Sequence, residues 1–170
     1  EITYQQTSQL FWNSGSGPMV DISEDSGPFF LEEIVARGLS AGDVDGDGDL
    51  DVLMTTNGGS AYLLRNDGPT GKAIAIKLRS QGGNKRAIGA LVSVTSRERT
   101  QTQMVRTGSS YLSHSPLELT FGVGQVERVE RIEIRWPDGT QESIEDVATS
   151  QRYQITQGEG VVHTTPFSHL

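Results

Sequence analysis

Hydrophobic and polar residues alternate along most of this chain with a period of two, the pattern of half-buried β-strands. The clearest runs are residues 74–78, 117–121 and 132–136, where every second residue is Ile, Leu, Phe or Trp. Glycine, proline, asparagine or aspartate bounds most runs, which is typical of turns between short strands. Because no segment shows a convincing helical period, the pattern predicts an all-β protein.

The predicted strands fall into two groups along the chain. In the first 71 residues we expect strands near 9–13, 18–23, 38–43, 50–56 and 61–66, while residues 31–36 fit a short helical turn and stay unassigned. The remainder predicts strands at 74–79, 90–95, 101–107, 117–121, 129–136, 140–144 and 152–156. About seven short strands separated by turns favour a β-sandwich for this second group.

Charge divides the chain in the same way. Residues 1–71 hold 12 acidic and 2 basic residues, a net charge of −10, whereas residues 72–170 hold 10 acidic and 12 basic residues, a net charge of +2. This contrast predicts two modules that meet near residues 68–71. The acidic half and the lack of a basic stripe argue against a nucleic-acid partner. No apolar run is long enough for a membrane span, and without cysteine neither disulfides nor thiol chemistry contribute.

The most distinctive stretch is an acidic loop, residues 43–51, in which every second residue is an aspartate. In a flat strand these carboxylates would share one face, and two such charges about 4 Å apart repel by roughly 1 to 4 kcal/mol. Gly46 and Gly48 instead allow the backbone to curl, because glycine accepts positive φ. A curled loop turns the carboxylates inward, where a cation can hold them together.

The predicted ligands are all oxygens: the side chains of Asp43, Asp45, Asp47 and Asp51 and the main-chain carbonyl of Asp49. Such a set suits Ca²⁺, and no His or Cys lies nearby to favour zinc or copper. The first half matches an EF-hand loop, but Met54 stands where that loop needs a bidentate Glu, and a β-like run follows. The alternative is a solvated acidic turn without a metal.

The pattern D-x-D-x-D-G-x-x-D running into a strand resembles the calcium hairpin of FG-GAP/VCBS repeats. Residues 36–68 (ARGLSAGDVDGDGDLDVLMTTNGGSAYLLRNDG) resemble one such repeat, and residues 10–23 the end of the preceding one. A faint internal repeat supports this, since residues 9–15 and 62–68 align 53 positions apart. The resemblance implies a partial β-propeller-type blade segment, as in the C-terminal part of a longer protein. Its open strand edge would be covered by the second module or by a neighbouring subunit.

Four strings in the second half resemble the ASPIC/UnbV domain, which follows VCBS repeats in cartilage acidic protein and its bacterial relatives. They are GGNKRAIGALVSV (82–94), VRTGSSYLSHSPLELTFGVG (105–124), VERIEIRWPDGTQE (129–142) and SQRYQITQGEG (150–160). The division predicted is a repeat segment at 1–71, an immunoglobulin-like ASPIC/UnbV β-sandwich at 72–160 and a tail at 161–170. The resemblance implies an extracellular calcium-binding protein of adhesive or matrix-interaction type, with no established enzymatic activity.

Motifs for catalysis are weak. No G-x-S-x-G nucleophile elbow occurs, and His114, His163 and His169 are scattered without ligand spacing. Trp12 and Trp136 lie within strand patterns and are expected in the core rather than as platforms for glycan stacking, and Tyr111 is expected to pack.

The leading hypothesis is therefore a non-catalytic calcium-binding module, secreted or at the cell surface, that binds an unidentified protein or glycan partner. Two alternatives stay open. One is a structural subunit that forms a homo-oligomer or fibre through open β-edges. The other is a glycan-binding accessory domain of a larger enzyme.

Overall fold

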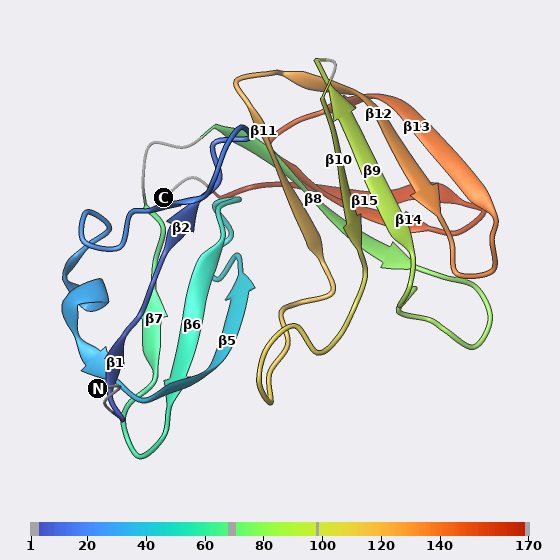
Figure 1. Cartoon of the computed structure of the whole chain (residues 1–170). Helices are drawn as coiled ribbons and strands as arrows, with labels where there is room; N and C mark the ends of the chain where they lie inside the picture. Colours follow the sequence, from blue (N-terminus) through green and yellow to red (C-terminus); the bar gives the residue numbers. More distant parts are fainter. Residues whose placement is uncertain (1–3, 68–70, 98, 169–170) are drawn as a thin grey trace.

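The computed structural model describes residues 4–67, 71–97 and 99–168 (Figure 1). Regular structure within these residues is β-strand throughout, apart from one short 3-10 helix. Five sheets are present, and they separate into an N-terminal module, residues 4–67, and a C-terminal module, residues 71–168. The prediction of an all-β protein is confirmed, and the sheets of the N-terminal module do not close into a propeller.

The N-terminal module contains three small antiparallel sheets. One has the strand order β5-β6-β7, and the other two are the pairs β1-β4 and β2-β3. The bounds are β1 Gln6–Thr7, β2 Phe11–Trp12, β3 Val20–Asp21, η1 Pro28–Leu31, β4 Glu33–Ile34, β5 Ala36–Gly42, β6 Asp51–Thr56 and β7 Tyr62–Leu64.

The five predicted strands of this module correspond to β2, β3, β5, β6 and β7, with shorter bounds at most ends. Residues 31–36, left unassigned, contain the end of η1 and the short strand β4. β2 and β7 lie in the two copies of the 53-residue repeat, where Phe11 aligns with Leu64, but the chain after each differs. β2 turns back to pair with β3, whereas the chain after β7 enters the C-terminal module. Residues 68–70, most of the predicted boundary, lie outside the described residues.

The C-terminal module is a sandwich of two four-stranded sheets, with orders β10-β9-β12-β13 and β11-β8-β14-β15. All neighbouring strands pair antiparallel except β8 and β14, which are parallel. The bounds are β8 Lys72–Arg79, β9 Leu91–Ser96, β10 Arg99–Met104, β11 Leu119–Gly124, β12 Arg128–Arg135, β13 Gln141–Ala148, β14 Gln151–Thr156 and β15 Gly160–Pro166.

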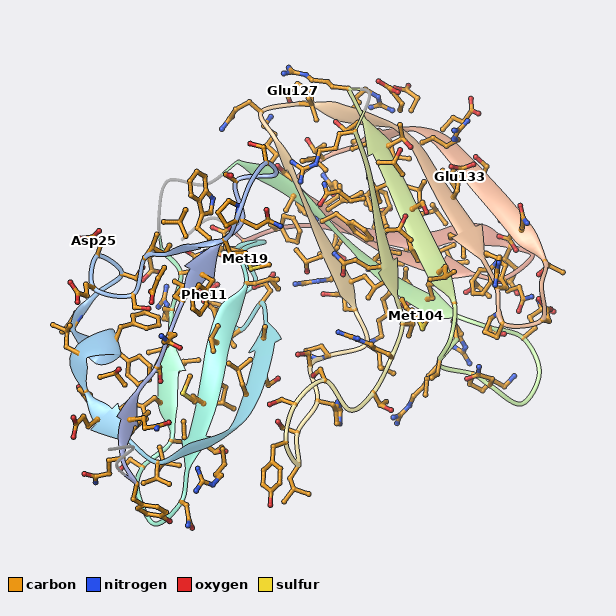
Figure 2. All side chains as sticks on the ribbon, in the orientation of Figure 1. Phe11, Met19, Asp25, Met104, Glu127 and Glu133 are labelled. Atoms are coloured by element: carbon orange, nitrogen blue, oxygen red, sulfur yellow. The ribbon has the colours of Figure 1, made fainter. Side chains whose placement is uncertain are left out.

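The main hydrophobic core lies between these two sheets (Figure 2). Ile74 and Ile76 of β8 face inward from one sheet, and Ile132 and Ile134 of β12 from the other. Trp136, with 1% of its surface exposed, is in the core as predicted. Fully burying each such side chain contributes roughly 1.5–3 kcal/mol, so this core is the main source of stability in the molecule.

The predicted tail at 161–170 needs correction. Residues 160–166 form β15, which pairs with β14 at the edge of a sheet, and Phe167 is buried against Ala73 and Ala75. The alternation rule missed this strand because Val161 and Val162 are consecutive apolar residues and both are exposed. Pairing of backbone groups, rather than an inward apolar face, holds β15 in place.

A serine-rich loop, residues 107–116, extends from the C-terminal module to the edge of β5 (Figure 1). The Leu39 N–H donates to Ser113 Oγ at 3.2 Å, Ser113 Oγ donates to Leu39 O at 3.1 Å, and the Ala41 N–H donates to Ser115 Oγ at 3.1 Å. Serine hydroxyl groups thus make the hydrogen bonds to the β5 backbone that a neighbouring strand would otherwise make. The blade edge at β5 is therefore covered by the second module. Tyr111, expected to pack, is instead 64% exposed in this loop.

Candidate metal centre

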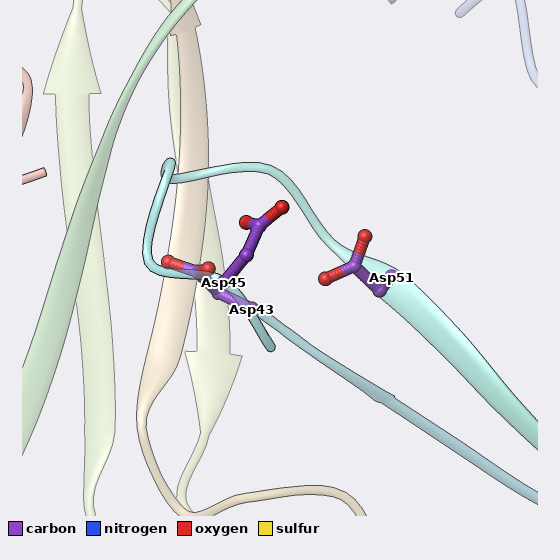
Figure 3. Close-up of side chains that lie close together, drawn as sticks. All are labelled: Asp43, Asp45 and Asp51. Carbon is purple, nitrogen blue, oxygen red and sulfur yellow. The ribbon is translucent and has the colours of Figure 1, made fainter. Parts of the chain in front are cut away.

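The acidic loop connects β5 to β6, and its two ends meet where Gly42 pairs with Asp51. Figure 3 shows Asp43 and Asp45 where the loop begins and Asp51 at its other end, where β6 begins. Carboxylate oxygens of these three residues lie within 4.8 Å of one another. The side chain of Asp43 and the whole of Asp51 are each only 2% exposed. Three negative charges are therefore concentrated at a largely buried point.

Two glycines and a series of side-chain hydrogen bonds shape the loop. Gly46 and Gly48 have φ values of +88° and +99°, a region that other residues enter only with strain. The Gly46 N–H donates to Asp43 Oδ1 at 2.6 Å and the Gly48 N–H to Asp43 Oδ2 at 3.1 Å. The Asp49 N–H likewise donates to Asp47 Oδ1 at 2.8 Å. The backbone therefore winds around the Asp43 carboxylate.

Asp51 closes the site from the strand side. Its Oδ2 accepts the Val44 N–H at 2.8 Å, and its Oδ1 accepts the Asn66 N–H at 3.0 Å. One carboxylate thus connects the start of the acidic loop, the start of β6 and the segment after β7. A carboxylate has about four acceptor positions, so these two bonds leave capacity for a cation.

A second group of carboxylates shares Asp45 with the first. Oxygens of Asp45, Asp47 and Asp67 lie within 4.8 Å of one another. Arg65 approaches this group and pairs with Asp45 at 2.7 Å and with Asp67 at 2.5 Å. Its hydrogen bond to Asp67, followed by the charges of Asp67 and Asp45, raises the pKa of Arg65 above its ordinary value.

The C-terminal module also contacts the acidic loop. Arg152 of β14 donates to Asp43 Oδ2 at 2.8 Å and to Glu118 Oε1 at 3.0 Å. The Ser168 N–H donates to Gly46 O at 2.7 Å, and Phe167 packs against Gly48. A Cβ on Gly48 would come within 2.6 Å of the Phe167 ring, so only glycine fits there.

The predicted ligands are thus distributed unevenly. Asp43, Asp45 and Asp51 come together, and Asp47 joins Asp45 and Asp67. Asp49 belongs to neither group, and the ligand predicted from it is its main-chain carbonyl rather than its side chain. The donors are all carboxylate or carbonyl oxygens, and this chemistry fits a hard cation such as Ca²⁺. Their assignment as ligands stays a prediction.

Sequence inspection missed four charged residues around the site. Arg65 and Asp67 lie just after β7, where the repeat pattern RNDG could have drawn attention to them. Arg152 and Glu118 had no local signal, because Arg152 is 109 positions from Asp43 along the chain. Only the packing of the two modules brings these two residues to the loop.

Trp12 has a different environment from that predicted, whereas the histidines that the structure describes agree with their prediction. Trp12 is 56% exposed rather than in the core, because β2 pairs only with β3 and little covers its face. His114 and His163 are exposed as expected, and their ring nitrogens contact Ser115 O and Thr165 Oγ1. His169 lies outside the described residues.

No helix among the residues that the structure describes has the length and apolar character needed to cross a membrane.

Comparison with known families identifies both modules. Residues 2–54 match an FG-GAP-like repeat, residues 35–74 an FG-GAP repeat, and residues 80–162 the ASPIC and UnbV family. A search of curated proteins found no match. Among solved structures, the chain is similar to a candidate cell adhesion protein from Bacteroides ovatus, with 11% identity and a TM-score of 0.32. The match covers 78% of this chain and only 62% of that protein, and so weak a likeness carries no functional argument. The family matches show that this chain joins FG-GAP repeats to an ASPIC/UnbV domain.

Proposed function

We propose that this chain is a non-catalytic, calcium-stabilised interaction module that acts outside the cell on a protein or glycan partner. The observation that carries the proposal is the convergence of Asp43, Asp45 and Asp51 at a largely buried point of an FG-GAP repeat. Burying like charges is costly unless an opposite charge compensates them. Around this loop carboxylates outnumber the guanidinium groups of Arg65 and Arg152, which leaves a need for further positive charge.

In this proposal the side chains of Asp43, Asp45, Asp47 and Asp51, with the carbonyl of Asp49, hold the ion. When bound, calcium supplies positive charge that neutralises the carboxylates and cross-links the loop. Asp51 orients the start of β6 through its bonds to Val44 and Asn66. The role of the ion is then structural, since it stabilises the hairpin that connects β5 and β6.

The first experiment compares thermal unfolding in EGTA and in millimolar calcium. A ligand that binds only the folded state at a hundredfold excess over its Kd adds about 2.7 kcal/mol. For a chain of this size we expect Tm to rise by about 5–10 °C in calcium. Asp45→Ala should abolish the calcium effect, whereas Asp25→Ala, an exposed aspartate of the same module outside the loop, should retain it (Figure 2). Identical melting curves in both buffers would contradict the proposal.

A specific observation favours a glycan as one class of partner. Trp12 and Phe11 of β2 are 56% and 50% exposed, and exposed aromatic rings suit stacking on sugars. Binding to an array of soluble glycans tests this directly. Trp12→Ala should abolish any signal, while Tyr111→Ala, at an exposed aromatic residue of the other module, should leave it unchanged. Binding that survives Trp12→Ala would point away from this surface.

The structural-subunit alternative depends on an open strand edge. The serine-rich loop already occupies the edge of β5, so that edge is closed to a neighbouring chain. Sedimentation at high protein concentration tests the alternative, and a strict monomer would remove it.

A further inference from the structure

We propose that the ASPIC/UnbV module completes the metal centre of the FG-GAP repeat, with Arg152 as a positioning residue for Asp43. Calcium binding and docking of the two modules are then coupled. This inference rests on the proposed calcium function. It adds that a residue of the other module affects how tightly the acidic loop binds calcium.

Arg152 makes the first link between the modules. Its guanidinium lies between Asp43 Oδ2 at 2.8 Å and Glu118 Oε1 at 3.0 Å, and the Asp43 side chain is almost fully buried. Hydrogen bonds between charged groups are the strong ones, and the planar guanidinium fixes its partners in one geometry. Asp43 is therefore oriented by a residue of the C-terminal module in addition to the N–H groups of Gly46 and Gly48.

The two carboxylate oxygens of Asp43 have different hydrogen-bond partners. Oδ2 accepts from both the Gly48 N–H and Arg152, which uses its two acceptor positions. Among the described residues, Oδ1 accepts one hydrogen bond, from the Gly46 N–H, which leaves one acceptor position for the cation. Without Arg152, Oδ2 keeps the longer bond from Gly48, at 3.1 Å, and the carboxylate is held less firmly.

The segment after β15 makes the second link. Phe167 lies against Gly48, and its ring centroid is 5.6 Å from the Arg152 guanidinium carbon. The Ser168 N–H donates to Gly46 O at 2.7 Å. Consecutive residues of the other module thus contact both glycines of the acidic loop. The C-terminal module therefore holds the loop backbone in addition to the Asp43 side chain.

Arg152 could act instead as a competing positive charge, and the two roles predict opposite results. Glu118 pairs with Arg152 and offsets its charge, so the geometric role should dominate. Residues that orient metal ligands typically account for a 10–100-fold difference in metal affinity. A competing charge would instead make calcium bind more tightly once Arg152 is removed.

The experiment measures calcium affinity by isothermal titration of the full chain. Arg152→Gln should raise the Kd by about tenfold or more, and Arg152→Lys, which keeps the charge but loses the fork, should also weaken binding. Arg128→Gln is the matched control, because Arg128 pairs with Asp146 within the C-terminal module. Unchanged or tighter binding in Arg152→Gln would overturn the inference. Absence of calcium binding by the unsubstituted chain would defeat the proposed function itself.

Hydrogen exchange tests the coupling without any substitution. Calcium should slow exchange of the Ser168 amide, which bonds to Gly46 of the loop. The Gln157 amide, which donates to Arg79 O within the C-terminal module, is the internal control and should not change. If calcium binds but leaves Ser168 exchange unaffected, the two modules are not coupled through the loop.

Discussion

At the scale of single residues, Gly48 shows how closely the two modules fit together. Its positive φ is required by the curl of the acidic loop, and its missing side chain makes room for Phe167. Gly46 shares the positive φ, but a Cβ there would come no closer than 3.5 Å to its nearest neighbour, Ser168 Oγ. A substitution at Gly46 therefore introduces backbone strain, whereas a substitution at Gly48 also disturbs the packing between the modules.

Alanine at each position should measure these two effects. Gly46→Ala should lower the free energy of unfolding by about 1–2 kcal/mol, because a residue with a Cβ is strained in the left-handed conformation. Gly48→Ala should lower the free energy of unfolding by about 1–3 kcal/mol more than Gly46→Ala does, because the ring of Phe167 must move. Chemical denaturation in EGTA, which removes any metal contribution, gives both values. Equal losses would mean that Phe167 does not confine Gly48.

At the scale of elements, the edge of β5 is closed by side chains rather than by a strand. Three serines of the serine-rich loop supply hydroxyl groups to the backbone of β5: Ser110, Ser113 and Ser115. Exposed strand edges invite pairing with other chains, so this cover protects the blade from aggregation. A hydroxyl can both donate and accept, which suits it to a strand edge that presents N–H and C=O groups.

Ser115→Ala should remove one side-chain hydrogen bond from the edge of β5. The Ala41 amide has Ser115 Oγ as its acceptor, so its exchange should accelerate by about 2–10-fold, the equivalent of roughly 0.5–1.5 kcal/mol. The Leu39 amide, bonded by Ser110 and Ser113, is the internal reference and should keep its rate. Native-state hydrogen exchange by NMR reads both. Unchanged Ala41 exchange would show that Ser115 does not protect the edge.

At the scale of the whole molecule, stability is unequal between the modules. The large core lies entirely in the C-terminal module. Among described residues of the N-terminal module, the buried hydrophobic side chains are Val35 and Met54. Such a small apolar core cannot offset the conformational entropy lost on folding. The N-terminal module therefore depends on contacts with its neighbour and on the charge balance of the acidic loop.

Separate expression of the two modules tests this dependence. Residues 71–170 should fold alone and melt cooperatively, whereas residues 1–70 should lack a cooperative transition in EGTA. Circular dichroism and the dispersion of amide NMR signals measure both outcomes. A cooperative melt of residues 1–70 in EGTA would show that this segment carries enough stability of its own.

The sequence by itself determined the strands with inward faces, because a period of two records burial directly. The strand predicted at 129–136 is β12 followed by the buried Trp136, and the aspartates and glycines of residues 43–51 form the turn between β5 and β6 and the start of β6. Both features depend on neighbours along the chain. Local sequence also sufficed for both family resemblances, which the family matches confirmed.

Only the tertiary structure decided what meets across the two modules. Arg152 reaches Asp43, Ser115 covers β5, and β15 forms at a sheet edge although its residues show no alternation. Trp12, which has the pattern of a core residue, is exposed because its two-stranded sheet has little packed against it. Contacts between residues far apart in the chain depend on how the modules pack, and no local period or spacing encodes them.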